Sequence, residues 1–568
     1  MVPSQKAVGV GAMRTVWMAV AALLCSGATL APPPDVPPVD VPLVPLVDAV
    51  RRGDAEAVRT LLKDGSDVDS ATPDGATALL WAVHTDQLEL VGLLLEAGAD
   101  VESTNRYGVG PASLAAENGN AAILERLLGA GVYANQTLPG GETLLMTAAR
   151  TGEPETVRTL LAHGADPNIR EMTRGQTALM WAAANDNAAA IHLLAEQGAD
   201  VDAKTDNPSP SGGGRSMSAP PTGFTPLMFA VRAGHMDATR VLLDAGADVD
   251  GTVSDGQSAL VVAAANANWE LAAYLLDRGA DATQAEAGWN ALHQTVRTRR
   301  MNWGGGTPAP RSSGTLESTD LIRRLLDAGV DVNARMTRFG MRDGQRNRFN
   351  RLGATAFVLA AKGTDAEAMR LLLDAGADAT IPTADGTTAM MVAAGLAIWN
   401  PGEDGGSLMG QEAEVLEAIR ITLEGGNDVN ARNWRGETAL HGVAFRGVII
   451  VVDYLVEQGA DLAALTDDGW SALAFARGLA FTDFYKDQVP TAARLEELMQ
   501  ARGFDTEGEA HRVSATVCYD CHATRPEQVR ALTERDEWMQ ANFDATNHAL
   551  QMMPGWKWQG LPEPPPKA

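Results

Sequence analysis

One short segment recurs along most of the chain and constrains the fold more than any other feature. It combines a glycine, a threonine or serine two residues later and a run of small and apolar residues, as in DGATALLWAV from Asp74 and RGQTALMWAA from Arg174. A second segment recurs between these copies, as in VGLLLEAGADVE and VRTLLAHGADPN. The lead glycines mostly stand 32 to 34 residues apart, as Gly75, Gly108 and Gly141 do. A period of this length indicates a stack of repeated supersecondary units.

Each part of the unit has a physical role in a pair of short helices. The threonine or serine can accept hydrogen bonds from the unpaired N–H groups that begin the first helix. Paired alanines such as Ala148 and Ala149 let neighbouring helices approach closely, and the leucine pair fills the seam. The glycine of the Gly-Ala-Asp triplet suits the left-handed backbone that ends the second helix. We therefore predict an all-α repeat solenoid of helix-turn-helix units with finger-like hairpins.

This unit resembles the ankyrin family, whose consensus joins D-x-x-G-x-T-P-L-H-x-A-A to a later L-L-x-x-G-A-D-V-N. The resemblance implies about twelve repeats over residues 44–503. No repeat buries its apolar side alone, so stacking creates one continuous core. Trp81, Trp181 and Phe229 fall at core positions between repeats.

Length and charge narrow the possible functions. The 568 residues exceed the roughly 250–300 that one compact core supports. The balance of 72 acidic to 45 basic residues gives a net charge of -27, which argues against binding to nucleic acids or anionic membranes. No hydrolase triad, nucleotide loop or paired-carboxylate signature rises above the repeats, so we predict no enzyme activity.

The N-terminus has the pattern of an export signal. Lys6 and Arg14 precede an apolar run from Val16 to Leu24, and small residues follow. We predict a signal peptide over residues 1–31, a Pro-rich linker over 32–43, and no stable membrane insertion after cleavage. Lipidation of Cys25 and an uncleaved anchor are the alternatives. The predicted location is the bacterial periplasm.

In the ankyrin family the partner lies along the concave side, and the resemblance carries those positions onto arginines and aromatic residues. The predicted partner contacts are Arg174, Arg232, Trp289, Arg297, Arg351, Trp434, Arg435, Phe445 and Arg446. Arg and Trp are enriched at binding hot spots. Inserts break the repeat period between Gly175 and Gly223, between Gly288 and Gly353, and between Gly386 and Gly436. One hypothesis is that repeats from about 286 to 450 clamp an acidic or aromatic-bearing protein; the other is that these arginines form solvated ion pairs.

The character of the sequence changes after the last repeat. Cys518 and Cys521 with His522 form C-x-x-C-H, the attachment motif of c-type haem, and Cys25 is the only other cysteine. Residues 504–560 resemble small bacterial cytochrome c modules, with a partial match at Thr533, Arg535, Glu537 and Trp538. The motif predicts thioethers from both cysteines and iron ligation by His522, with Met552 or Met553 favoured as sixth ligand over Met539 and His548. Residues 561–568 are predicted to be a disordered tail.

Other uses of this motif stay open. A zinc clip would use both cysteines with His522 and either His548 or His511. A disulfide between the cysteines needs no metal at all. The sequence thus favours an exported protein-binding scaffold with an electron-transfer haem, and leaves two alternatives: a scaffold alone, or a haem enzyme or gas sensor with an open iron position.

Overall fold

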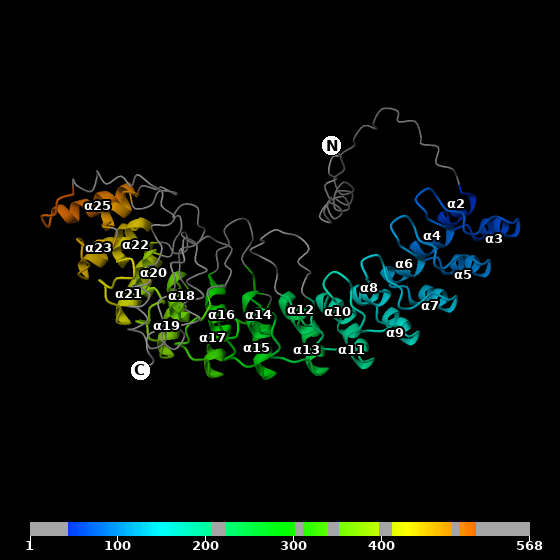
Figure 1. The fold of residues 1–568 in the computed structure, drawn as a ribbon, viewed down its shortest axis with the longest axis horizontal. Helices are drawn as coiled ribbons and strands as arrows, with labels where there is room; N and C mark the ends of the chain where they lie inside the picture. The colour runs from blue at the N-terminus through cyan, green and yellow to red at the C-terminus, as the bar shows by residue number, and fades with distance from the viewer. Residues whose placement is uncertain are drawn as a thin grey trace, which may run out of the picture.

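The computed structural model describes residues 44–206, 222–300, 310–312, 314–338, 351–396, 412–467, 469–479 and 488–506. Within these residues the regular structure is helical, and the only β-type pairings are isolated bridges in the fingers. Short helices alternate between two rows that follow one another along an arc (Figure 1).

The inner row of helices lies along the inside of the arc (Figure 1). It consists of α2 (Pro45–Arg51), α4 (Ala78–His84), α6 (Pro111–Asn118), α8 (Leu144–Thr151), α10 (Ala178–Ala184), α12 (Pro226–Ala233), α14 (Ala259–Ala265), α16 (Ala291–Arg299), α18 (Ala356–Lys362), α20 (Ala389–Ala394), α22 (Ala439–Arg446) and α24 (Ala472–Ala476).

The outer row follows the outside of the same arc. It consists of α3 (Ala55–Lys63), α5 (Leu88–Glu96), α7 (Ala121–Gly129), α9 (Pro154–Ala162), α11 (Ala188–Glu196), α13 (Met236–Asp244), α15 (Trp269–Asp277), α17 (Ser318–Asp327), α19 (Ala366–Asp374), α21 (Glu412–Glu424), α23 (Ile449–Glu457) and α25 (Val489–Gln500). Each helix packs against its partner in the same repeat, each inner helix packs against the next inner helix, and most outer helices pack against the next outer helix.

The helices begin and end as the repeat pattern predicts. Thr143 at the start of α8 accepts a hydrogen bond from the backbone N–H of Met146 at 3.1 Å, and Ser471 caps α24 in the same way. Gly98, which follows α5, has a φ of 84°, a conformation that costs a residue with a Cβ atom extra energy. The short helices therefore have defined beginnings and ends.

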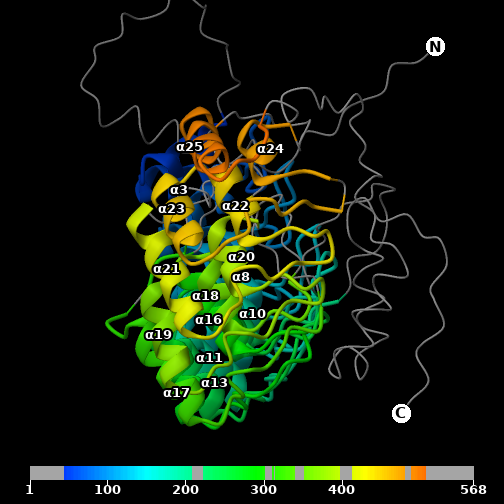
Figure 2. The ribbon, with the colours of Figure 1, turned by 90° about the vertical axis from the view of Figure 1, so that its left-hand side faces the viewer.

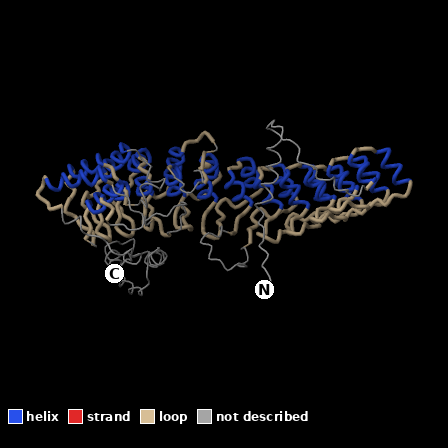
Figure 3. The backbone as a smooth tube through the Cα atoms, turned by 90° about the horizontal axis from the view of Figure 1, so that it is seen from above, coloured by secondary structure: helices blue, strands red, loops and turns tan. Residues whose placement is uncertain are grey.

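The fingers join each outer helix to the next inner helix and lie on one side of the solenoid (Figures 2 and 3). Backbone hydrogen bonds link the tips of neighbouring fingers: Arg106 N donates to Asp74 O at 3.0 Å, and Asp206 N donates to Arg174 O at 2.8 Å. Antiparallel bridges such as Thr137 with Thr143 close the individual fingers. The finger tips therefore form a continuous edge beside the inner helices.

Side-chain amides connect successive repeats at the ends of the inner helices. Asn187 Nδ2 donates to Ala149 O at 2.8 Å, and Asn268 Nδ2 donates to Val231 O at 3.0 Å. The last carbonyls of a helix have no partner within the helix, so these bonds satisfy groups that would otherwise be unpaired. In these repeats a side-chain amide thus fixes the helix end of the repeat before it.

The fold confirms the predicted stack of helical repeats with finger hairpins. Phe229 is buried in the hydrophobic core. Trp81 and Trp181 pack against this core and are half-buried. The predicted signal peptide, most of each insert and the C-x-x-C-H motif lie outside the described residues. None of the described helices is long and apolar enough to cross a membrane.

Candidate protein-binding face

We use the term inner face for the surface formed by the C-terminal ends of the inner helices together with the neighbouring finger tips. Both sets of residues lie along the inside of the arc or beside it (Figures 1 and 2). A surface of this kind is extended and is interrupted only at the boundaries between repeats. The predicted partner contacts belong to this surface. In the structure some of their side chains are exposed, some are half-buried and some are buried.

Two exposed arginines and two phenylalanines form the most distinctive group on the inner face. We call Arg174, Phe224, Phe229 and Arg232 the arginine–phenylalanine patch. The guanidinium carbon of Arg232 lies 5.1 Å from the ring centre of Phe224 and 5.4 Å from that of Phe229. The two rings are 5.7 Å apart and tilted by 54°, so they form an apolar floor beneath the guanidinium.

Arg174 reaches this patch from the finger of the preceding repeat. Partial burial over the two rings, and then the positive charge of Arg174, lower the pKa of Arg232 below its usual range. Both arginines are exposed as whole residues. The patch therefore carries two positive charges at the surface, and the charge of Arg174 acts on Arg232.

A buried carboxylate holds the finger that carries Arg174. Glu171 is 8% exposed and accepts hydrogen bonds from the backbone N–H groups of Arg174 at 2.7 Å and Gln176 at 3.1 Å. Burial alone would raise the pKa of Glu171, but these backbone hydrogen bonds and one from Thr173 outweigh it and lower the pKa. Arg174 thus projects from a fixed turn and not from a loose loop.

Cation–aromatic contacts recur along the first half of the inner face. The guanidinium of Arg51 lies 4.7 Å from the ring centre of Trp81, and that of Arg150 lies 6.0 Å from Trp181. Arg150 also forms an ion pair with Glu117 of the preceding repeat. The arginine–phenylalanine patch differs from this second contact because its arginines have no such acidic neighbour in the described structure.

Four of the predicted partner contacts are buried. Exposed fractions are 6% for Trp289, 5% for Arg351, 7% for Phe445 and 9% for Arg446. These values leave little of the four side chains accessible to a partner.

The reason for burial is clearest at Arg446. Its Nη1 donates to Ala393 O, 3.3 Å away, near the end of α20. Gly395 follows α20, and a Cβ atom there would lie 3.0 Å from Cβ of Arg446. The missing side chain at Gly395 lets Arg446 lie against the helix end, and burial lowers the pKa of Arg446 to about 10.

Three further predicted contacts are half-buried: Arg297, Trp434 and Arg435. Burial lowers the pKa of Arg297 to about 10, and burial followed by the charge of Arg297 lowers that of Arg351 to about 9. The guanidinium of Arg435 lies 4.7 Å from the ring centre of Trp434. Only Arg174 and Arg232 of the predicted set are exposed.

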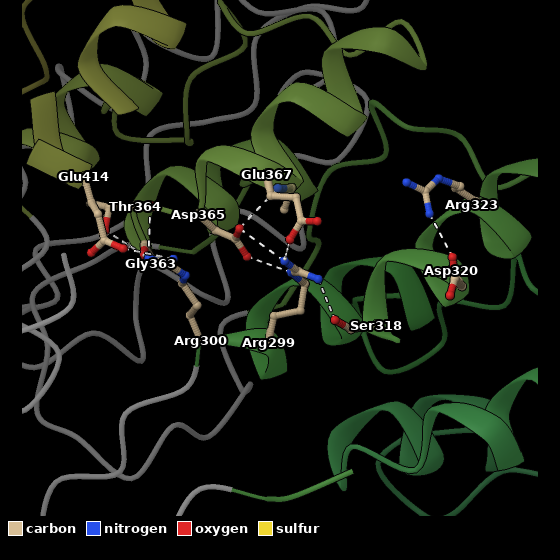
Figure 4. Close-up of polar contacts among 11 residues, drawn as sticks. Arg299, Arg300, Ser318, Asp320, Arg323, Gly363, Thr364, Asp365, Glu367 and Glu414 are labelled. Carbon is tan, nitrogen blue, oxygen red and sulfur yellow. Dashed lines mark hydrogen bonds and ion pairs between the residues drawn. The ribbon is translucent and has the colours of Figure 1, made fainter. Parts of the chain in front are cut away.

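A charged network that the sequence did not reveal joins three repeats in the second half (Figure 4). Arg299 Nε donates to Asp365 Oδ2 at 2.7 Å, and Arg299 Nη2 donates to Glu367 at the same distance. Neighbouring Arg300 donates to Thr364 O at 3.3 Å and to Glu414 at 3.2 Å. Asp365 occupies the position that Asn187 and Asn268 hold in other repeats, and the arginines replace the amide-to-carbonyl bond found there.

Phe224 is the member of the patch that the sequence analysis missed. It stands between the finger glycine Gly223 and the capping residue Thr225, and Trp289 holds the corresponding position two repeats later. The same positional rule could therefore have identified it. The described residues contain no group of three or more His, Cys, Asp or Glu side chains suited to a metal. The residues proposed for haem or metal, Cys518, Cys521, His522, Met552 and Met553, lie outside them.

Comparison with known proteins agrees with this geometry. Residues 33–105, 112–205 and 212–286 match a family model described as ankyrin repeats (3 copies), and residues 435–467 match one described as ankyrin repeat. The matched residues therefore resemble ankyrin repeats, a class of repeat that mediates protein–protein interactions. Among solved structures, the ankyrin repeat domain of human ASB11 is similar at 26% identity, covering 42% of this chain and 98% of that one. Its TM-score of 0.35 is too low to support an argument about overall shape.

Proposed function

We propose that this chain is an exported ankyrin-repeat scaffold that binds a protein along its inner face and carries a c-type haem near its C-terminus. The binding part is supported by the extended inner face and by the ankyrin matches. The haem part rests on a single observation, the C-x-x-C-H motif of Cys518, Cys521 and His522 in a chain with one other cysteine.

The proposed attachment assigns a role to each residue of the motif. Cys518 and Cys521 would form thioethers with the haem, and His522 would ligate the iron, with Met552 or Met553 as the sixth ligand. A haem held in this way supplies one-electron transfer, so the bound partner would be its donor or acceptor. Export to the periplasm fits covalent haem attachment, which takes place outside the bacterial cytoplasm.

A haem stain and a pyridine haemochrome spectrum test this assignment on the full chain, produced in bacteria with the haem-attachment machinery. We expect covalent haem in the natural sequence and none in the Cys518→Ser/Cys521→Ser variant. Absence of covalent haem from the natural sequence would rule out the electron-transfer function and leave a scaffold with a zinc clip or a disulfide.

The iron ligand set is tested on the same material. With Met552 or Met553 bound to iron, the reduced protein should not bind carbon monoxide, and replacing the ligand methionine by alanine should open the site. Rapid binding of carbon monoxide by the natural sequence would favour a gas sensor or haem enzyme.

A further inference from the structure

The charges of the arginine–phenylalanine patch are not balanced within the described structure. Arg174 and Arg232 form no ion pair with a described carboxylate, although the whole chain carries 72 acidic residues and a net charge of -27. Several exposed arginines of the outer helices are paired instead, as Arg158 is with Glu155 and Arg240 with Asp237 at 2.8 Å. The positive charges of the patch are therefore available to an acidic ligand.

Asp206, an acidic residue on the neighbouring finger, is already engaged. The backbone N–H of Asp206 donates to Arg174 O, but its carboxylate pairs with Arg170 at 2.8 Å. The fixed turn around Glu171 keeps Arg174 on the tip of its finger. The patch is consequently held in place by neighbours that do not neutralise it.

The phenylalanine rings set the direction from which a ligand can approach. A guanidinium that lies over a ring face uses that face for the cation–aromatic contact and keeps the N–H groups along its edge for other acceptors. Carboxylates match the spacing of these N–H groups and accept two parallel hydrogen bonds. An apolar floor also reduces screening by water, which strengthens such a contact.

We infer that the arginine–phenylalanine patch binds an acidic segment of the partner protein, with an Asp or Glu carboxylate accepting hydrogen bonds from Arg174 and Arg232. This inference rests on the protein-binding part of the proposed function and is independent of the haem. Like-charge repulsion between the two arginines is relieved when the carboxylate binds, so binding is coupled to neutralisation of the site. Binding of a nucleic acid at this patch is disfavoured, because the otherwise strongly acidic chain repels its phosphates.

Selection from a phage-displayed library of random peptides tests the inference on the full chain. We expect peptides rich in Asp and Glu to be enriched on the natural sequence and lost on the Arg174→Gln/Arg232→Gln variant. The matched control is Arg158→Gln/Arg240→Gln, which changes the net charge equally on the outer helices and should retain the peptides. Circular dichroism verifies that both variants keep the helical content.

The size of the effect is then measured by fluorescence anisotropy with one enriched peptide. Loss of two charge-assisted hydrogen bonds should weaken binding by about 10- to 100-fold. Enrichment of neutral or basic peptides, equal binding to both variants, or displacement by single-stranded DNA at equal charge concentration would each overturn the inference. Peptides that bind elsewhere on the array would overturn the inferred role of the patch but would still support the proposed scaffold function.

Discussion

Arg232 and Arg446 stand near the C-terminal ends of two inner helices, α12 and α22, and their surroundings differ. Arg232 is exposed and lies over two phenylalanine rings beside a second arginine. Arg446 is 9% exposed and donates to the end of the preceding inner helix. Gly395 of the preceding repeat leaves room for Arg446, whereas Phe224 and Phe229 of its own repeat lie beneath Arg232. Arg232 stands seven residues after the capping Thr225 and Arg446 eight after Thr438, so an arginine near the end of an inner helix is exposed in one repeat and buried in the other.

The contrast extends beyond these two residues. In the second half of the array, Arg299 and Arg300 brace neighbouring repeats, and Arg351 is buried. His293 and His441 are also buried there, whereas the equivalent positions of α8, α10 and α12 hold Met146, Met180 and Met228. The second half therefore uses charged and titratable side chains for its own stability, and the central repeats leave theirs at the surface.

The largest expected effect comes from breaking the network around Arg299. Asp365 is 2% exposed, so Asp365→Ala leaves a largely buried guanidinium without its main partner and removes the cap of α19. We expect a loss of about 3–5 kcal/mol of stability in the second half. Urea unfolding followed by circular dichroism measures it.

The control for this variant is a surface pair in the same region. Arg323 and Asp320 form an exposed ion pair at 2.8 Å, so Arg323→Ala should change stability by less than about 1 kcal/mol. Similar losses for the two variants would contradict a structural role for the Arg299 network.

Acid should destabilise the second half selectively. Burial lowers the pKa of His293 to about 4, below the usual value of about 6.5 for an unfolded chain. Between these values the unfolded chain binds a proton that the folded chain does not, so stability falls as the pH decreases from about 6.5 to about 4. For His293 alone we expect a loss of about 2 kcal/mol between pH 7 and pH 5.

The variant His293→Met isolates this contribution, because methionine occupies the equivalent position in α8, α10 and α12. It should be less stable at pH 7, since the hydrogen bond from the ring to Ala334 O is lost, but it should depend less on pH. Hydrogen exchange at both pH values locates the change. An equal pH dependence in the natural and variant proteins would show that His293 is not the sensitive group.

Two alanine variants test the difference between Arg446 and Arg232 directly. Arg446→Ala removes a donor from the end of α20 and leaves a cavity, so we expect a loss of about 1–3 kcal/mol. Arg232→Ala removes an exposed cation–aromatic contact, which contributes about 0.5–1 kcal/mol. The reverse order, measured by urea unfolding, would mean that the two arginines do not have the assigned roles.

Much of the fold could be predicted from the sequence because each repeat carries its own local signals. The capping residues, the paired alanines and the helix-ending glycines interact with residues close by in the sequence. Their roles can therefore be predicted from the sequence alone. Exposure of the candidate contacts could not be predicted in the same way. It depends on a residue in another repeat, as Arg446 depends on Gly395, or on a pair far apart in sequence, as with Arg299 and Asp365.

Site-specific photo-cross-linking in cells tests most directly whether the central repeats form the binding face. Met172 is 75% exposed on the finger that carries Arg174, and Leu465 is 40% exposed on a finger of the second half. A photoreactive amino acid is placed at one position or the other in the full chain. We expect a cross-linked partner, through an acidic segment, at position 172 and none at 465. A partner cross-linked at 465 but not at 172 would contradict it.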